Sequence, residues 1–535
     1  MLTGRPQFCV LIVFLLCQPL YVVADFYRGP TQDAKYQLVL QGPDEGIRLN
    51  EVQSWTVSIL DDQGNPVTPR SLVFLGGMPG HGHGLSSLPR VTKQLSPGRY
   101  QVDGVLLNMY GEWEIVIGVV GDAGPDKATI PFRFMPPQAD VTASGQWSAQ
   151  QLALIRSLWL GAAQEAPTDP SNRFDGRPDA IRLGEQLFND PKLSRDANIA
   201  CATCHKPEFA FTDALQTSMG SKKLSRNSQG VQGIARAKWF YWDGRRDSLW
   251  AQALTPIETP GEMDNNRAAV VTYVLSNDDY RSAMEKLNVE ISSADGLPQS
   301  AGPYGDENAK LAWSKLKPAD REQINRLFAD IGKIIASYVA SLEPSYSRFD
   351  RYVERVLDGG SADEFLTESE IRGLKLFIDP SKTHCMRCHN GPYFSSFGFH
   401  NIGSGVNPES GSRDFGRLFG LKSARVDEFN CIGRYSDLDA DACRELIYAT
   451  EGHADDGAFK VPGLRDVALT APYFHDGRFE TLKESLEFYR SPPDQLVSGN
   501  ELLPLDLSDD ELQDIAAFLG SLTGEDRRAT RQASK

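Results

Sequence analysis

Histidine, cysteine and methionine are scarce in this chain of 535 residues, which contains eight of each. No histidine occurs between His205 and His384, and no methionine follows Met386. The first absence leaves a long segment without an imidazole that could bind a metal. The second excludes methionine as a metal ligand in the C-terminal part of the chain. The length itself suggests two to four domains with an ample core.

Basic residues are fewer than acidic ones, with 55 Lys and Arg against 71 Asp and Glu, so the formal net charge is −16. This balance argues against nucleic acid as a partner, although an acidic surface could steer a basic protein partner. Beyond residue 24, no apolar stretch is long enough to span a bilayer. We therefore expect a protein that neither binds nucleic acid nor spans a membrane.

One apolar run covers residues 8–17 and follows Arg5. It is broken by Gln18-Pro19, and the small residue Ala24 follows shortly afterwards, which is the pattern of an export signal. The alternative is a membrane anchor, for which the run is short. The sequence thus predicts that residues 1–24 form a cleaved signal peptide and that the mature protein is periplasmic.

Two pentapeptides of the form C-x-x-C-H contain half of the cysteines. Their residues are Cys201, Cys204 and His205 in the first copy and Cys385, Cys388 and His389 in the second. Two thiols one helical turn apart can add to the two vinyl groups of a haem, and the histidine that follows can then ligate the iron. A redox pair would not need the histidine in both copies, and a zinc site would not normally separate its halves so widely. The two motifs predict two covalently bound c-type haems.

Cys9 and Cys17 belong to the predicted signal, so Cys431 and Cys443 are the two cysteines that remain in the mature chain. They lie on either side of an acidic loop. An oxidising compartment favours a disulfide between them, and two buried free thiols are the alternative.

Residues 25–136 have the pattern of an all-β domain. Short segments that alternate in polarity or are rich in β-branched and aromatic residues are separated by turn residues such as Ser96-Pro-Gly98. About seven such strands predict an immunoglobulin-like sandwich.

The segment from Met78 to Gly84 contains His81 and His83, and Met109 follows later, an arrangement that resembles small exported β-domains of the FixH/YtkA type. Methionine sulfur together with imidazole nitrogen would suit copper. The alternative is a mobile Gly/His loop with Met109 in the core, and the domain is then a docking or dimerisation module.

An internal repeat appears in the helical part of the chain, which begins near Gln146. Gly184 to Pro191 precedes the first haem motif, and Gly373 to Pro380 precedes the second; both read G-x-x-L-F-x-D-P. The repeat predicts two related cytochrome c-like lobes. We place them at residues 141–355 and 356–526, with a tail at 527–535.

Further motifs accompany the haem motifs in a fixed order. They are residues 201–213, 240–245, 253–258, 385–391, 399–403 and 461–477. Over roughly residues 145 to 525 the chain resembles the bacterial dihaem cytochrome c peroxidase/MauG superfamily. The resemblance implies two helical c-haem lobes with Ca²⁺ near their interface. The expected fold is therefore multidomain, with an N-terminal all-β sandwich followed by two mainly α-helical cytochrome c-type haem lobes.

The resemblance implies that the haem on His205 reacts with peroxide. The absence of nearby histidine leaves its iron open, with Met219 as the one conceivable soft ligand. Glu262 would move a proton between the peroxide oxygens, and Gln252 and Pro256 would line the same pocket. A dry pocket would raise the pKa of the Glu262 carboxyl; the alternative is that Glu262 is a surface residue in a Pro-Gly loop.

Trp242 matches the family tryptophan between the two haems, where an indole can relay an electron; core packing is the alternative. Asn227 resembles the family's Ca²⁺ ligand, with backbone carbonyls near Pro462 as companions, because oxygen atoms suit Ca²⁺. For the sixth ligand of the second haem the sequence offers Tyr473 or His475, whereas Phe479 cannot ligate.

Together these residues predict an exported dihaem peroxidase that reduces H₂O₂ at the first haem. Its electrons would come through the second haem from a protein donor. That donor would be a small cytochrome or cupredoxin, or a partner protein whose Trp or Tyr is oxidatively modified. The alternative is a non-catalytic dihaem electron-transfer or copper-handling protein.

Overall fold

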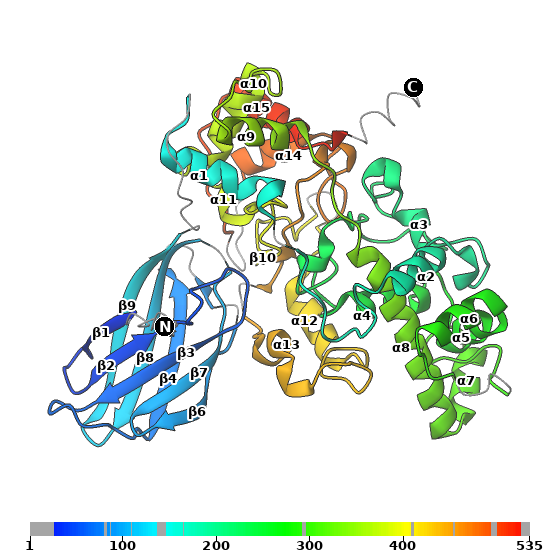
Figure 1. The fold of residues 1–535 in the computed structure, drawn as a ribbon, viewed down its shortest axis with the longest axis horizontal. Coiled ribbons are helices and arrows are strands. Elements are labelled where there is room, and N and C mark those ends of the chain that lie inside the picture. The colour runs from blue at the N-terminus through cyan, green and yellow to red at the C-terminus, as the bar shows by residue number, and fades with distance from the viewer. Residues whose placement is uncertain are drawn as a thin grey trace, which may run out of the picture.

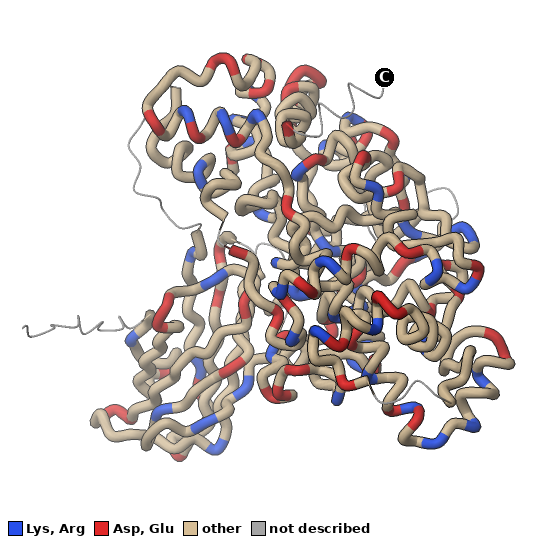
Figure 2. Tube along the Cα trace, turned by 45° about the vertical axis from the view of Figure 1, so that its right-hand side comes forward, with Lys and Arg blue, Asp and Glu red and all other residues tan. Residues whose placement is uncertain are grey.

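A computed structural model of the protein describes residues 26–79, 83–85, 87–108, 110–135, 146–163, 165–291, 296–407, 411–452, 455–493 and 500–525. It consists of a β-domain beside a larger helical part (Figure 1). None of the helices in these ranges is both long and apolar enough to cross a membrane. Acidic and basic residues are interspersed along the coloured parts of the tube in Figure 2, but most of the excess negative charge lies in the C-terminal part of the sequence, where residues 356–535 contain 31 Asp and Glu against 19 Lys and Arg.

The β-domain is a sandwich of two antiparallel sheets. One sheet has the order β1 (Tyr27–Pro30), β2 (Gln37–Gln41), β3 (Gln53–Leu60), β7 (Arg99–Val105) and β6 (Arg90–Ser96). The other has the order β5 (His83–Gly84), β4 (Ser71–Met78), β8 (Gly111–Gly121) and β9 (Gly124–Phe134). Buried and partly exposed residues alternate along β3 and β8 because successive side chains of a strand point to opposite faces. Their inner faces share one core that includes Val57 and Ile117. The predicted all-β sandwich is confirmed.

The first helical lobe is built around the long helix α8 (Pro318–Ala340), most of whose central residues are buried. Helices α2 (Pro178–Phe188), α4 (Leu249–Glu258) and α5 (Arg267–Ser276) pack against it. Helices α6 (Asp278–Lys286) and α7 (Glu307–Lys315) complete this lobe. Trp250 and Phe328 are fully buried in its core.

The second lobe contains α10 (Glu368–Ile378), α14 (Leu482–Arg490) and α15 (Asp509–Ser521). Two helices that begin before residue 356, α1 (Ala149–Leu158) and α9 (Arg348–Leu357), also bury their apolar faces in this core. The core of the second lobe therefore contains segments that precede the first lobe in the sequence as well as segments that follow it.

The repeated glycine has the same role in both lobes. A Cβ atom added to Gly184 on α2 would lie 2.3 Å from the Ile334 carbonyl oxygen on α8. A Cβ atom added to Gly373 on α10 would lie 2.0 Å from the Asp514 carbonyl oxygen on α15. The helix before each haem motif thus crosses its partner helix at backbone-to-backbone distance, which only glycine allows. The G-x-x-L-F repeat reflects one structural unit used twice.

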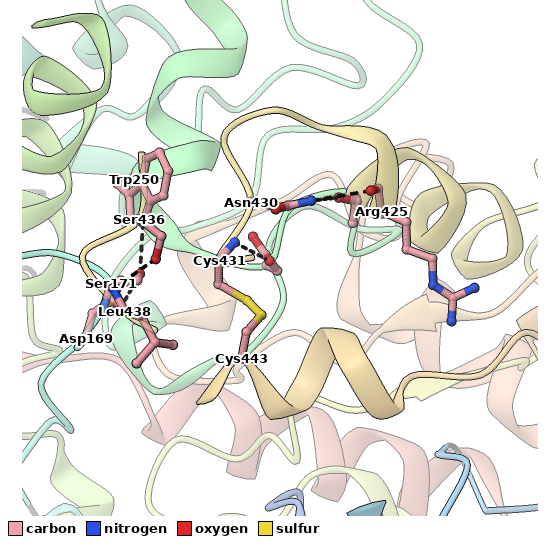
Figure 3. Close-up of a disulfide and its surroundings, with 11 residues drawn as sticks. Asp169, Ser171, Trp250, Arg425, Asn430, Cys431, Ser436, Leu438 and Cys443 are labelled. Atoms are coloured by element: carbon pink, nitrogen blue, oxygen red, sulfur yellow. Dashed lines mark hydrogen bonds between the residues drawn. A yellow bond between two sulfur atoms is a disulfide. The ribbon is translucent and has the colours of Figure 1, made fainter. Parts of the chain in front are cut away.

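A loop of the second lobe reaches back onto the first. Cys431 and Cys443 form a disulfide around this loop, as predicted (Figure 3). Within the loop, Asp437 lies 2.6 Å from the Lys333 ammonium of α8, and Tyr435 accepts a hydrogen bond from Asn325 of the same helix. The loop therefore fastens the two lobes to each other.

The β-domain rests on the second lobe through segments near the disulfide and near the second haem motif. The Leu88 amide donates to the Tyr448 carbonyl of α13 (Arg444–Tyr448), and Arg444 contacts Ser54 and Asp103. Gly104 lies so close to the Tyr448 ring that an added Cβ would be 2.3 Å from it.

Candidate haem pockets

The first haem motif forms one turn of helix, α3 (Cys201–Cys204), which places two free thiols on the same side. The Nδ1 atom of His205 lies 2.9 Å from the carbonyl oxygen of Phe211. A carbonyl only accepts, so Nδ1 is the protonated nitrogen and Nε2 keeps its lone pair for a metal. Burial lowers the pKa of His205, which also favours the neutral ring.

The second motif repeats this geometry on α11 (Cys385–Cys388). Nδ1 of His389 lies 3.0 Å from the Phe394 carbonyl, and burial lowers the pKa of His389 to about 4. Phe211 and Phe394 both have a left-handed backbone, with φ of 60° and 53°. The backbone carbonyls of these two phenylalanines orient the two histidines in the same way.

A largely apolar cavity of about 290 Å³ adjoins the second motif. Residues from both lobes line it, including His389, Trp242 and Tyr489. One buried nitrogen of a lining residue, Nδ1 of His384, has no hydrogen-bond partner in the described part of the chain. His400, also at the wall, contacts both the Cys388 thiol and the Glu501 carboxylate. An apolar cavity with two thiols and an oriented imidazole at its wall fits a haem.

The predicted distal residues of the first motif lie together. Gln252 and Pro256 are on α4, and Glu262 lies in the loop after it, where its carbonyl accepts a hydrogen bond from the Ser221 amide. The Glu262 carboxyl is mostly buried and close enough to Cys204 to influence that thiol electrostatically. Burial raises the pKa of Glu262, and this effect exceeds the opposing effect of two nearby guanidiniums, those of Arg245 and Arg246. A carboxyl whose pKa is raised in this way can both accept and donate a proton.

Tyr241 belongs to the same group of side chains, although the sequence did not single it out. Its hydroxyl is 3.4 Å from the Gln252 carbonyl, and the Arg245 guanidinium lies 3.5 Å from its ring centroid. Its backbone is left-handed, with φ of 69°. By contrast, Met219 is 50% exposed and its side chain lies at the surface.

Trp242 and Asn227 lie at the junction of the lobes. Trp242 is almost fully buried, donates from Nε1 to the Asn227 carbonyl at 2.9 Å, and lines the second cavity. Its own carbonyl accepts a hydrogen bond from the Lys460 amide of β11 (Phe459–Lys460) in the second lobe. Asn227 receives a backbone contact from the other lobe too, because its amide donates to the His475 carbonyl.

The three polar side chains that could face the second haem differ in their partners. The Tyr473 hydroxyl donates to the Val467 carbonyl at 3.1 Å, and the His475 ring stacks on Phe459 at 3.8 Å. The hydroxyl of Tyr489, on α14, has no hydrogen-bond partner among the described residues and lines the cavity beside the thiols. Burial raises the pKa of Tyr489, and the nearby thiols of Cys388 and Cys385 add to this. Tyr489 could not be singled out from the sequence because no motif surrounds it, although it lies on an amphipathic helix.

Of the predicted copper residues, Met78 is buried and packs with Trp113. His81, Met109 and the side chain of His83 lie outside the described residues, as does the predicted signal peptide.

A family model for di-haem cytochrome c peroxidases matches residues 178–357. A MauG protein of Methylophilus methylotrophus is 27% identical over 394 residues, which are 70% of this chain and 96% of that protein. A cytochrome-c peroxidase, IdrP2, of Pseudomonas sp. (strain SCT) is 30% identical over 363 residues, covering 67% of this chain and 85% of that protein. A cytochrome c551 peroxidase of Nitrosomonas europaea is 27% identical over 381 residues, covering 70% of this chain and 88% of that protein. The chain thus belongs to the di-haem cytochrome c peroxidase/MauG family, oxidoreductases that act on peroxide and hold two haem c groups.

Proposed function

We propose that the protein is an exported enzyme that reduces H₂O₂ at the pocket of His205, using electrons from an external donor that enter at the pocket of His389. The observation that carries this proposal is the grouping of Glu262, Gln252 and Tyr241 beside the first motif, with no histidine to occupy the open side. Haem, when bound through Cys201 and Cys204, supplies the metal centre that cleaves the peroxide bond.

Within this pocket, Glu262 would take a proton from the inner peroxide oxygen and return it to the outer one, so that water can leave. Its raised pKa suits a group that must both accept and donate. Gln252 and Pro256 would shape the pocket and limit the entry of water.

Trp242 would carry electrons between the pockets, because it touches segments of both lobes and lines the second cavity. Tyr489, rather than Tyr473 or His475, would supply a protein oxygen ligand to a metal in the second pocket, since its hydroxyl lines the cavity whereas the Tyr473 hydroxyl donates to Val467 and the His475 ring stacks on Phe459. Asn227, at the junction of the lobes, would bind Ca²⁺ together with backbone carbonyls near Pro462.

An oxygen ligand at the second pocket also favours a second outcome, the oxidation of a Trp or Tyr on a partner protein, over electron supply by a small cytochrome or cupredoxin. Hard oxygen ligands stabilise oxidised metal centres better than thioethers do. The predicted export signal and the disulfide support a periplasmic location.

The test is electron paramagnetic resonance of the purified ferric protein, followed by stopped-flow mixing with H₂O₂. We expect one high-spin site, from the pocket of His205, and reaction with peroxide without prior reduction. Two low-spin sites with two axial protein ligands each, together with no reaction, would select the non-catalytic electron carrier instead.

A further inference from the structure

A second cavity, of about 1480 Å³, lies where the β-domain meets the helical part, and its walls come from loops of the β-domain and from segments of both helical lobes. Tyr393 is the one tyrosine among the described residues that lines both this cavity and the cavity beside the second haem motif. The residue is only 6% exposed. Tyr393 therefore lies between the second haem pocket and the space under the β-domain.

The β-domain covers part of the second haem motif. Cys388 packs against a buried cluster of the β-domain that includes Met78 and Trp113. The Asn50 side chain also donates to the Ser396 carbonyl in the loop after the motif. A donor that approaches from this side meets the β-domain first, so its electrons need a protein group that carries them inward.

A short path joins Tyr393 to His389. Nδ1 of His389 lies 3.0 Å from the carbonyl oxygen of Phe394, the residue directly after Tyr393. One hydrogen bond and one residue of the backbone thus separate the tyrosine from the imidazole. The Tyr393 ring packs tightly against the first lobe, because a Cβ atom added to Gly233 would lie 2.4 Å from it.

The phenol of Tyr393 has a base as its partner. Its hydroxyl donates at 2.7 Å to the carboxylate of Glu343, which follows α8, and the Arg236 guanidinium lies 2.6 Å from the other oxygen of that carboxylate. Burial and the bond to Glu343 raise the pKa of Tyr393, so the phenol is protonated at neutral pH. Loss of an electron makes a phenol strongly acidic, and a carboxylate already in contact can take the proton. The Glu343 side chain is 41% exposed, so it can exchange that proton with water.

The other two tyrosines of the second cavity have different surroundings. The Tyr473 hydroxyl donates to the Val467 carbonyl, which is not a base. The groups that influence Tyr489 electrostatically are the thiols of the second motif, which become thioethers once haem is attached. Tyr393 is thus the one of the three whose hydroxyl donates to a carboxylate.

We propose that Tyr393 relays electrons from an external donor into the second haem pocket, with Glu343 as its proton acceptor. The proposal rests on the proposed function, because H₂O₂ supplies the oxidising equivalents. In each cycle the O–H bond of Tyr393 breaks, one electron passes to the second pocket and the proton passes to Glu343. An external one-electron donor and Glu343 then return the electron and the proton, so the O–H bond forms again. Two cycles supply the two electrons with which H₂O₂ takes up two protons and becomes two water molecules.

The test is electron paramagnetic resonance of the haem-loaded protein, frozen at intervals after mixing with H₂O₂ in the absence of a donor. We expect an organic radical signal that narrows when the protein is made with ring-deuterated tyrosine, and we expect ascorbate to remove it. Tyr393→Phe should abolish this signal and should slow the return of the second haem to its resting spectrum by ascorbate. A radical that ascorbate does not reduce would show a site of oxidative damage and would overturn the relay.

Glu343→Gln is the second variant. It keeps a hydrogen-bond acceptor beside the phenol but removes the base, so the rate constant for radical formation should fall by about 10²-fold. Because Tyr393 is unchanged in this variant, the result does not depend on how well Tyr393→Phe folds. An unchanged rate constant would contradict the role of Glu343.

The matched control is Tyr435→Phe. Tyr435 is similarly buried and donates to the Glu322 carboxylate at 3.0 Å, but it lines neither cavity. This variant should keep the full radical signal. A signal that is lost in the control or retained in Tyr393→Phe overturns the proposal, even if the enzyme consumes peroxide.

A second source of oxidising equivalents separates this proposal from the proposed function. A laser flash on a ruthenium photosensitiser with an electron acceptor oxidises the protein without H₂O₂. If the protein does not react with H₂O₂, the proposed function fails, whereas a flash-induced tyrosyl radical that disappears in Tyr393→Phe still supports the relay. If neither H₂O₂ nor the flash gives a radical at Tyr393, the relay fails.

Discussion

The carboxyl of Glu262 is subject to two opposing effects. Burial raises its pKa, while the guanidiniums of Arg245 and Arg246 lower it, and burial is the larger effect. The group can therefore be charged before peroxide arrives and neutral after it takes a proton. Because the charged form accepts the proton, the rate with H₂O₂ should rise as the pH increases through this raised pKa.

Glu262→Gln removes the proton acceptor while keeping the shape of the side chain. We expect the rate constant for the reaction with H₂O₂ to fall by about 10²- to 10⁴-fold and to lose its pH dependence. Stopped-flow absorbance measures both. Glu208→Gln, at an exposed position shortly after the first motif, is the control and should leave the rate unchanged.

Asp247 is a second carboxyl whose charged form is disfavoured by burial. One of its oxygens accepts from the Cys431 amide at 2.9 Å, and the other is buried without a partner among the described residues. Burial raises the pKa of Asp247 to about 7, and other carboxylates add to the effect. The folded state thus binds a proton that the unfolded state releases near pH 4, so its contribution to stability is lost as the pH rises from about 4 to 7.

Asp247→Asn should remove this dependence. At pH 5 we expect the melting temperatures of variant and wild type to be close; at pH 8 the variant should melt several degrees higher. Differential scanning calorimetry across this range gives the comparison, with Asp441→Asn in the neighbouring exposed loop as the control. If the difference in melting temperature between variant and wild type decreases as the pH rises, the pKa of Asp247 is not raised in the folded protein.

At the scale of elements, the crossing of α10 and α15 offers a paired test. Gly373 is in backbone contact at the crossing, so Gly373→Ala should cost about 1–3 kcal/mol or more through overpacking. Gly520 lies on α15 of the same pair, and an added Cβ there meets nothing within 4 Å. Gly520→Ala should be neutral or gain up to about 1 kcal/mol from helix propensity. Thermal melting should move in opposite directions for the two variants.

The disulfide loop is the element that links the lobes. The two half-cystines are 12 residues apart in sequence, and between them Asp437 and Tyr435 contact α8. Replacing both cysteines by alanine should cost about 2–4 kcal/mol, mostly because the unfolded loop is no longer closed. Urea unfolding measures the loss. The haem spectrum of the folded variant should match that of the wild type, since neither cysteine belongs to a haem motif.

At the scale of the whole molecule, polar side chains as well as apolar and backbone contacts join the β-domain to the second lobe. The Arg444 guanidinium lies 3.3 Å from the Asp103 carboxylate across this interface. Arg444→Glu places two carboxylates opposite each other. We expect a larger radius of gyration in solution X-ray scattering, because like charges repel and the docking loosens.

Exchanging the two charges across the interface is the first control for this prediction. Adding Asp103→Arg to Arg444→Glu should restore part of the compact form. Arg434→Glu, which breaks an exposed ion pair with Glu322 inside the helical part, should leave the radius unchanged. An unchanged radius in Arg444→Glu would show that the remaining contacts hold the domain by themselves.

Local patterns in the sequence were sufficient to predict the parts of this protein that depend on residues close together along the chain. Each haem motif brings its thiols and histidine together within five residues, and strand alternation and turn residues predict the β-sandwich. The disulfide was predictable because the other cysteines had assigned roles. The internal repeat indicated two lobes because the same helix crossing needs the same glycine.

Tertiary structure decided what depends on distant segments. It brings α1 and α9 into the second core, Glu262 close to Cys204, and Trp242 between the two lobes. It also brings Tyr489, on α14, to the wall of the second cavity, because only packing determines which side chains reach it. The cavity beneath the β-domain has no trace in the sequence, since its walls come from loops far apart along the chain and a cavity is a property of how surfaces meet.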